Sequence, residues 1–363
     1  MRTKMQTQNS GRGFTLLEMI VSMALGLVVM AAMASLFKSG MNSAMLVTQR
    51  AENQENMRAA IELMEKDISM AGAGLPSGGI QLPTGAGNNG LSRYGCDQTG
   101  ACHVPTSTYP NTPNANYMYG IIPGWKNGVE ANAAIPAAPA AINDSITVIY
   151  ADYNFPLYQY TGKFTDFTGK KLNLTAIAGD APPAANSNGG IQAGDLIMVS
   201  GASLTAVGEV TTPAALSLTF NDLDALNINQ SGAASGNLAA LAKAVNGGSV
   251  SVIRLFAVTY YITVPAAGQT PRLMRQVNGL TPVPVADNII NLQFAFDTYN
   301  STNNALDANQ ANPLGVGESP NNIQKVNIVV MGQSMQNQGN KSQNMYLATS
   351  VAARDMAYRN RYQ

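Results

Sequence analysis

A continuous apolar run follows the first 13 residues of the chain. Residues 14–37, FTLLEMIVSMALGLVVMAAMASLF, hold few polar side chains besides Glu18 and several hydroxyl groups. A helix of 24 residues is roughly 36 Å long, which is enough to cross a hydrocarbon core of about 30 Å. The pattern therefore predicts a membrane-spanning helix.

The helical pattern continues beyond this run as an amphipathic segment. Met57, Ile61, Met64 and Ile68 recur at intervals of three and four residues, and charged residues mostly fall between them. No proline interrupts residues 14–71, and two glycines and a proline follow closely. We expect one helix over 14–71, whose second half packs this apolar stripe against a globular domain.

The rest of the chain alternates between polar stretches and short apolar segments. Residues 73–144 are rich in Gly, Pro, Asn and Ala, which indicates a long surface region with little regular structure. Short segments rich in β-branched and aromatic residues then predict strands. These segments are 145–150, 195–200, 207–211, 216–220, 249–264, 272–277, 292–296, 326–330 and 345–351. We expect 207–211 and 216–220 to form a hairpin, and 238–245 to form a short helix. The order of elements predicts an α+β fold in which the long N-terminal helix packs on an antiparallel sheet with long loops.

Composition narrows the classes of function. Charged residues make up 12% of the chain, about half of their usual share in soluble proteins, and 21 basic residues balance 21 acidic ones. No basic stripe gives electrostatic support to nucleic-acid binding. The composition is more typical of an extracellular β-rich domain than of a cytosolic enzyme.

The residues before the apolar run indicate its orientation. Arg2, Lys4 and Arg12 occur in residues 1–13 without any acidic residue. Positive flanks stay in the cytoplasm, so we expect the domain after the helix to lie outside the cytoplasm. A cleaved secretory signal is the alternative, but its apolar core is shorter, lacks a carboxylate and precedes a small-residue cleavage site.

The junction GFTLLE, residues 13–18, resembles the motif of type IV prepilins. Its features are a short basic leader, Gly13, Phe14 and then Glu18 within an unbroken apolar run. The resemblance implies that a prepilin peptidase cuts between Gly13 and Phe14, and that Phe14 becomes the N-methylated first residue. The apolar run would then be retained in the mature protein.

Glu18 is unusual because a carboxylate at membrane depth costs on the order of 3 kcal/mol. In the pilin family, this acid pairs with the amino terminus of a neighbouring subunit in the filament, and such pairing removes most of the penalty. The resemblance therefore implies a subunit-docking role for Glu18. Alternatively, Glu18 pairs with the amine of its own Phe14 and with the helix dipole, in which case its mutation has little effect on assembly.

Later segments narrow the resemblance to PilW-type minor pilins. The helix end MEKDISMAGAG and the order of RLMRQVNG, VADNIINLQFAFDTYN, VNIVVMGQS and YLATSVAARDMAYRN are similar to that family. The likeness covers about the first 75 and the last 115 residues, and the GspJ pseudopilin of type II secretion has the same helix-plus-sheet plan. The expected organisation is a leader (1–13), a membrane and filament-core half of the helix (14–37), an amphipathic half (38–72), a loop region (73–144) and a β-rich pilin domain (145–363).

Two cysteines lie close together in the loop region. In an exported domain, a local disulfide between Cys96 and Cys102 is expected. The adjacent His103 raises the alternative of a metal site, but three ligands within eight residues lack a fourth. Free thiols are the remaining alternative.

Other patterns give weaker indications of chemistry. The stretch GAGNNG at 85–90 matches G-x-G-x-x-G, but no strand precedes it and no helix follows. The Asp- and Asn-rich segments 221–230 and 297–310 are expected to be solvated loops, with a weak calcium alternative at Asp297 and Asp307. With one histidine and no nucleophile motif, no catalytic constellation is apparent, so we expect neither an enzyme nor a cofactor or resident metal.

The sequence as a whole predicts a PilW-like minor pilin that primes or joins type IV pilus assembly, with a possible tip complex. A type II secretion pseudopilin, or a tip adhesin whose binding site lies in the divergent middle region, are the alternatives. Expected partners are the prepilin peptidase, other minor pilins, the major pilin and the assembly platform. We expect a single-pass inner-membrane precursor with a periplasmic domain, which then reaches the pilus or cell surface.

Overall fold

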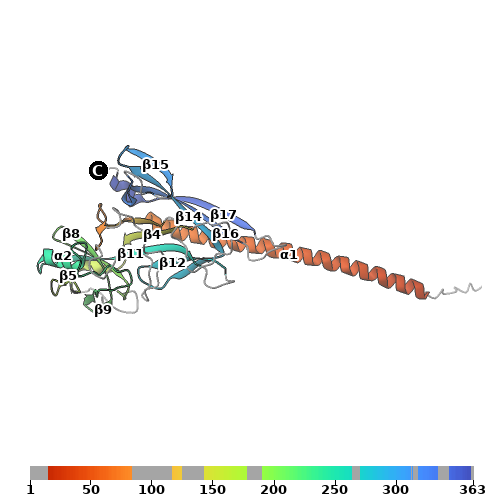
Figure 1. The fold of residues 1–363 in the computed structure, drawn as a ribbon. Helices are drawn as coiled ribbons and strands as arrows, with labels where there is room; N and C mark the ends of the chain where they lie inside the picture. Colours follow the sequence, from red (N-terminus) through yellow and green to blue (C-terminus); the bar gives the residue numbers. More distant parts are fainter. Residues whose placement is uncertain are drawn as a thin grey trace, which may run out of the picture. The chain divides into compact units, whose positions relative to one another are not determined.

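The computed structural model describes residues 15–83, 117–124, 143–177, 190–263, 270–311, 313, 318–333 and 343–360. The helices are α1 (Leu16–Ser69), α2 (Leu238–Val245) and α3 (Arg354–Asn360), with short 3-10 turns at Pro156–Gln159 and Pro320–Asn322. A long N-terminal helix with mostly antiparallel sheets confirms the predicted α+β class (Figure 1). The chain divides into two compact units, Met1–Glu52 and Asn53–Gln363.

The strands of the described residues fall in three sheets. The two-stranded sheet pairs β1 (Ile80–Gln81) with β2 (Tyr117–Met118). The largest sheet contains β3 (Ile121–Gly124), β4 (Ser145–Ala151), β5 (Tyr160–Phe164), β6 (Lys171–Ala176), β7 (Leu196–Gly201), β8 (Leu204–Glu209), β9 (Thr212–Ala214), β10 (Ser217–Thr219), β11 (Val250–Thr263), β12 (Arg272–Val277) and β13 (Val283–Asp287). The third sheet has the order β15-β14-β16-β17, from β14 (Ile289–Asn300), β15 (Ala305–Gln310), β16 (Ile323–Gln333) and β17 (Asn344–Ala352).

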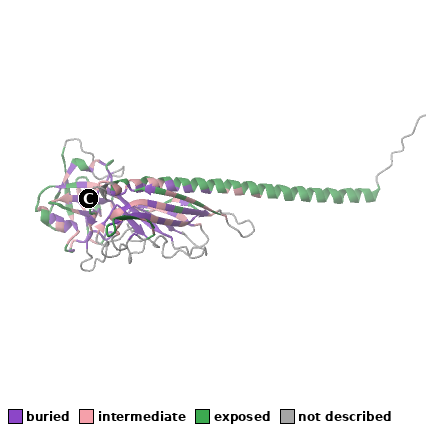
Figure 2. Ribbon diagram, turned by 90° about the horizontal axis from the view of Figure 1, so that it is seen from above, coloured by how far each residue is buried: buried purple, intermediate pink, exposed green. Residues whose placement is uncertain are grey.

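The C-terminal part of α1 packs its predicted apolar stripe into the domain core. Met57, Ile61, Met64 and Ile68 are all buried, as expected from their spacing, and buried positions appear on this part of the helix in Figure 2. The approach is close at Gly332 of β16, where an added Cβ atom would lie 3.0 Å from the Met57 sulfur. A side chain at position 332 would therefore press against Met57.

A glycine-containing turn ends α1 against β4. Gly72 and Gly74 adopt left-handed backbone conformations, with φ values of 80° and 73°, which glycine adopts at little cost. The Gly72 N–H donates to the Ile149 carbonyl at 2.9 Å, and the Ala151 N–H donates to the Ala73 carbonyl at 2.8 Å. The helix end is therefore fixed by backbone hydrogen bonds to a buried strand.

Strand β11 is the central strand of the largest sheet and pairs with four other strands. Its first half pairs with β7 on one edge and with β5 on the other, while its second half lies between β4 and β12. The two halves contribute to different cores. Val250 and Val252 pack with residues of β5–β8, β10 and α2, whereas Val258, Tyr260 and Ile262 pack with α1. One long strand thus joins two layers of the domain.

Asn278 fills the gap on β11 between the end of β7 and the start of β12. Its side chain accepts from the Ala257 N–H at 2.8 Å and donates to the Leu255 carbonyl at 3.1 Å, and its own N–H donates to the Ala257 carbonyl. Asn278 is buried and has a φ of 51°. The side chain therefore replaces the strand contacts that are missing at this point.

Two features of the β region differ from the sequence-based expectation. The predicted hairpin of 207–211 with 216–220 is wrong, because β8 pairs with β7, and β10 pairs with β9 and β6. The β7–β8 turn uses Ala202 and Ser203 at positive φ, residue types that give little turn signal. The sequence also did not predict strands β5, β6, β9, β13 and β15 or helix α3. Within the predicted loop region, the structure describes β1, β2 and β3.

Candidate functional site

The N-terminal half of α1 presents an apolar surface without any internal cover. Its large apolar side chains from Leu16 to Phe37 are about half to three-quarters exposed, and none of the residues in its most apolar 18-residue window is buried in the protein (Figure 2). Among the described residues, α1 is the one helix long and apolar enough to cross a membrane. Such a surface is unfavourable in water and favourable in lipid or against other apolar helices.

Glu18 takes part in the N-terminal cap of this helix. Its carboxylate accepts hydrogen bonds from the Thr15 backbone N–H at 3.1 Å and from the Thr15 hydroxyl at 3.2 Å, while the Glu18 N–H donates to the Thr15 Oγ1 at 3.3 Å. This reciprocal arrangement is a capping box, which satisfies backbone donors that a helix start leaves open. Glu18 therefore has a partner within its own chain, Thr15, whereas the Phe14 amine of the local alternative lies outside the described residues.

The other residues predicted for processing lie outside the described part of the chain. Gly13 and Phe14 precede the first described residue, and Cys96, Cys102 and His103 fall within 84–116. Their predicted roles stay predictions.

A buried carboxylate near the C-terminal end of α1, Asp67, binds side chains of the neighbouring strands. It was not singled out from the sequence. Asp67, which is 3% exposed, accepts from the Tyr150 hydroxyl at 2.9 Å, from the Tyr260 hydroxyl at 2.6 Å and from the Arg275 Nε at 2.9 Å. These partners come from β4, β11 and β12, so one helix side chain holds three adjacent strands. The available signal was an acid beside Ile68, on the mostly apolar face of α1.

The electrostatics of this group keep both phenol groups neutral. Burial and the negative charge of Asp67 raise the pKa values of Tyr150 and Tyr260 well above their ordinary value. Although burial acts to lower it, the hydrogen bonds and charge of Asp67 raise the pKa of Arg275. The group is an ion pair with two neutral donors, which is the condition under which a buried charge is tolerated.

The segment 221–230 is a loop, as expected, but Asp224 and residues 226–230 are buried in a polar network and not solvated. Asp224 accepts from the Ile228 and Asn229 backbone N–H groups at 2.9 and 2.7 Å, and Asn229 exchanges hydrogen bonds with the Glu209 backbone. Backbone donors of its own segment occupy the carboxylate oxygens of Asp224, so calcium has no advantage there. The sequence could not indicate this, because Asp- and Asn-rich loops are usually exposed.

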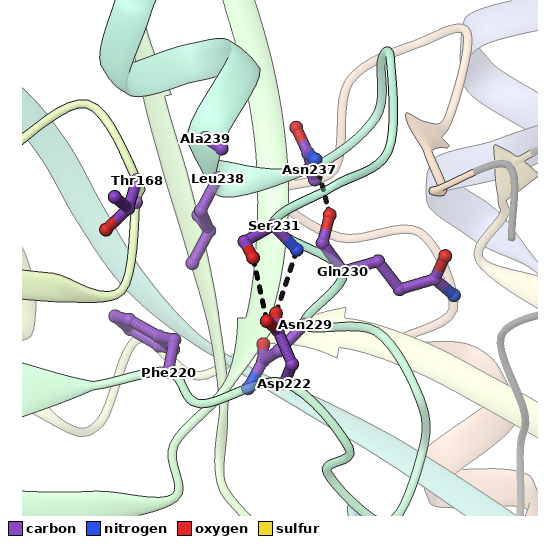
Figure 3. A pocket seen from close by; sticks show the side chains of 10 residues that line it. Thr168, Phe220, Asp222, Asn229, Gln230, Ser231, Asn237, Leu238 and Ala239 are labelled. Carbon is purple, nitrogen blue, oxygen red and sulfur yellow. Dashed lines mark hydrogen bonds between the residues drawn. The ribbon is translucent and has the colours of Figure 1, made fainter. Parts of the chain in front are cut away.

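Beside this network lies a small pocket next to the start of α2. Thr168, Phe220, Asp222, Asn237 and Leu238 are among the residues that line it (Figure 3). Asp222 accepts from the Ser231 N–H and hydroxyl at 2.8 and 2.7 Å and pairs with Lys170 at 2.9 Å. The cavity volume is about 10 Å³, which is room for about one water molecule and not for a cofactor.

Asp297 and Asp307, the weak calcium candidates, are held by protein donors. Asp297 is buried, pairs with the Lys325 Nζ at 2.7 Å and accepts from the Asn309 N–H at 2.9 Å. Asp307 accepts from the Asn300 amide at 2.7 Å. Asp297 is thus not in a solvated loop, and the described residues contain no group of three or more His, Cys, Asp or Glu side chains that could hold a metal ion.

The comparisons with known proteins identify the N-terminal segment. Residues 9–34 match the model of the prokaryotic N-terminal methylation motif, which is a type IV pilin-like prepilin signal. No curated protein and no solved structure matches the chain. The match covers Thr15, Glu18 and the exposed apolar start of α1, so the candidate functional site is this segment.

Proposed function

We propose that the chain is a PilW-like minor pilin, a structural subunit that primes or joins the assembly of a type IV pilus. The observation that carries the proposal is the methylation motif at residues 9–34 at the head of an exposed apolar helix. That motif supports a type IV pilin-like or pseudopilin subunit with a membrane-anchored precursor. The PilW-like assignment goes further, and it rests on the resemblance of the helix end and of the last third of the chain.

The proposed mechanism is packing and not bond chemistry. Before assembly, lipid covers the apolar half of α1; after assembly, the apolar helices of neighbouring subunits cover it. Other minor pilins, the major pilin and the assembly platform are the proposed partners, and the domain after the helix is proposed to lie in the periplasm and then on the pilus. A pseudopilin of a type II secretion system carries the same kind of motif, and it is the second candidate for that reason.

Processing of the leader is the first test. We expect prepilin peptidase to cut between Gly13 and Phe14, and a methyltransferase to modify the new amino terminus of Phe14. A Gly13→Ala variant should keep its leader, so intact mass spectrometry should find a chain heavier by 13 residues and without the N-methyl group. A Gly11→Ala variant, two residues earlier, is the matched control and should be cut and methylated as usual. Normal cleavage of the Gly13 variant would contradict the proposal.

The second test concerns the docking role of Glu18. Because Glu18 also belongs to the capping box, two variants are needed to separate its charge from its capping role. A Glu18→Gln variant keeps an oxygen that can accept from Thr15 but loses the charge that a neighbour's amino terminus needs. Thr15→Ala removes the hydroxyl of the capping box and keeps the carboxylate. If docking is the main role, Glu18→Gln should lower the number of pili per cell by about tenfold, which corresponds to about 1.4 kcal/mol, and Thr15→Ala should change it little.

Electron microscopy of cells that produce each variant measures the outcome, with immunoblots to confirm equal amounts in the membrane. Equal pilus numbers in the wild type and in Glu18→Gln would leave only the local role within the helix. The predicted Cys96–Cys102 disulfide is checked in the same preparations by peptide mass mapping without reducing agent.

A further inference from the structure

The outer edge of β17 has no partner strand among the described residues. β17 pairs with β16 along nine residues, from Asn344 opposite Gln333 to Ala352 opposite Lys325, without a register shift. In the order β15-β14-β16-β17 it is the last strand. A strand in this position presents a row of backbone N–H and C=O groups on its other side.

The register shows which residues point to the open side. The Ala353 N–H donates to the Gln324 carbonyl at 2.9 Å, next to the pair Lys325–Ala352. In an antiparallel ladder, every second residue exchanges hydrogen bonds with its partner strand. The odd-numbered residues of β17 therefore bond to β16. The even-numbered ones, which direct their backbone groups to the open edge, are Asn344, Tyr346, Ala348, Ser350 and Ala352.

Other edge strands of the described structure carry features that hinder the addition of a further strand. β3, β9 and β13 contain Pro123, Pro213 and Pro284, respectively, and the pairing of β13 is also irregular. β15 is joined to β14 through a register shift and includes Asn309 at a φ of 56°. β8 ends at Glu209, whose N–H is bonded by the Asn229 side chain. β17 has nine residues without proline, charge or bulge.

The side chains of β17 favour an uncharged partner. Its even-numbered side chains are exposed and neutral, and Tyr346, which is 70% exposed, offers an aromatic ring for a cross-strand contact. The odd-numbered side chains face the core, where Thr349 donates to Glu65 of α1 at 2.5 Å. An added strand would thus extend the third sheet without disturbing the packing on α1.

We infer that the outer edge of β17 is a strand-addition site that takes one extended, uncharged segment of a neighbouring pilin-like subunit. The inference rests on the proposed function, because assembly brings such a neighbour beside the domain. The backbone of an extended chain is the group that matches five outward pairs of N–H and C=O groups at a two-residue repeat. A helix or a folded loop cannot match them.

Amide hydrogen exchange tests this inference residue by residue. The full chain is measured in detergent and in pili isolated from cells that produce it with their own pilus subunits. In detergent, the odd-numbered amides of β17 should exchange slowly and the even-numbered amides fast. In the pili, the amides of Tyr346, Ala348 and Ser350 should slow by about 100-fold or more, because strand pairing protects them. Fast exchange at these positions in pili, or slow exchange in detergent, overturns the inference.

Ala348→Pro supplies the matching variant, with Ala348→Ser as its control. Proline removes an N–H that does not bond to β16, so the odd-numbered amides should stay protected and show that the fold is intact. We expect the fraction of Ala348→Pro that co-isolates with other pilin-like subunits to fall about tenfold, and that of Ala348→Ser to stay as in the wild type. If the wild type, Ala348→Pro and Ala348→Ser all co-isolate equally, the strand-addition site is overturned but the proposed function is not. A wild-type chain that co-isolates with no pilin-like subunit contradicts the proposed function as well.

Discussion

At the scale of residues, the domain fixes its geometry with a few buried polar groups placed between apolar layers. Asp67 joins α1 to three strands, Asn278 completes the hydrogen bonding of β11, and Arg254 joins β11 to the end of β4. Arg254 pairs with Asp152 at 2.6 Å, and its guanidinium lies 4.4 Å from the centre of the Phe155 ring. Each of these groups has several hydrogen-bond or ion-pair partners, and such partners offset the cost of burying a polar or charged group.

A substitution at Asp67 tests how far this anchoring contributes to stability. Asp67→Asn keeps the size of the side chain but leaves the Arg275 guanidinium without its counter-charge. We expect the free energy of unfolding to fall by about 2 to 4 kcal/mol. Denaturant unfolding followed by circular dichroism measures the loss.

The matched control is Glu62→Gln, five residues earlier on the exposed side of the same helix. It also removes one negative charge from α1, but no described hydrogen bond or ion pair holds Glu62, so its effect should stay within about 0.5 kcal/mol. Similar losses in both variants would mean that helix charge, and not the Asp67 contacts, determines the stability.

At the scale of elements, the sequence predicted the strongly periodic segments and missed those without a period. The apolar repeat of Met57, Ile61, Met64 and Ile68 gave the buried face of α1, and the 16-residue apolar segment at 249–264 gave β11 almost to the residue. Segments such as β5, YTGKF, carry a glycine and a lysine in five residues and therefore give little strand signal. Their strand character comes from pairing with β11 and β6, which is tertiary information.

The candidate functional residues also fall into those that a local sequence pattern can predict and those that only the fold brings together. The prepilin signal is a local pattern, so residues 13–18 could be recognised from the sequence alone. Asp67 depends on Tyr150, Tyr260 and Arg275, which lie 83 to 208 positions away in the chain. No local pattern brings those residues together, and the burial of Asp224 and Asp297 likewise follows only from the fold.

At the scale of the whole molecule, one buried acid should make folding depend on pH. Glu209 is 3% exposed, and its carboxyl accepts from the Leu226 N–H at 2.9 Å while it lies beside Asp224. Burial, together with the hydrogen bond and like charge of Asp224, raises the pKa of Glu209 to about 9 from an ordinary value of 4.5. The folded protein therefore holds a proton here that the unfolded chain releases at a much lower pH.

The sign of the effect follows from this difference in bound protons. The stabilising contribution of protonated Glu209 is complete below about pH 4.5 and is lost as the pH rises to about 9, with a slope of at most about 1.4 kcal/mol per pH unit. Glu209→Gln stays neutral throughout, so its unfolding free energy should vary less between pH 5 and 9 than that of the wild type. Asp222→Asn is the control: although burial acts to raise it, hydrogen bonds from Ser231 and Lys170 lower the pKa of Asp222, so that acid affects stability only at more acidic pH. Thermal unfolding at half-unit pH steps measures both slopes. A wild-type slope that Glu209→Gln leaves unchanged would assign the pH dependence to another group.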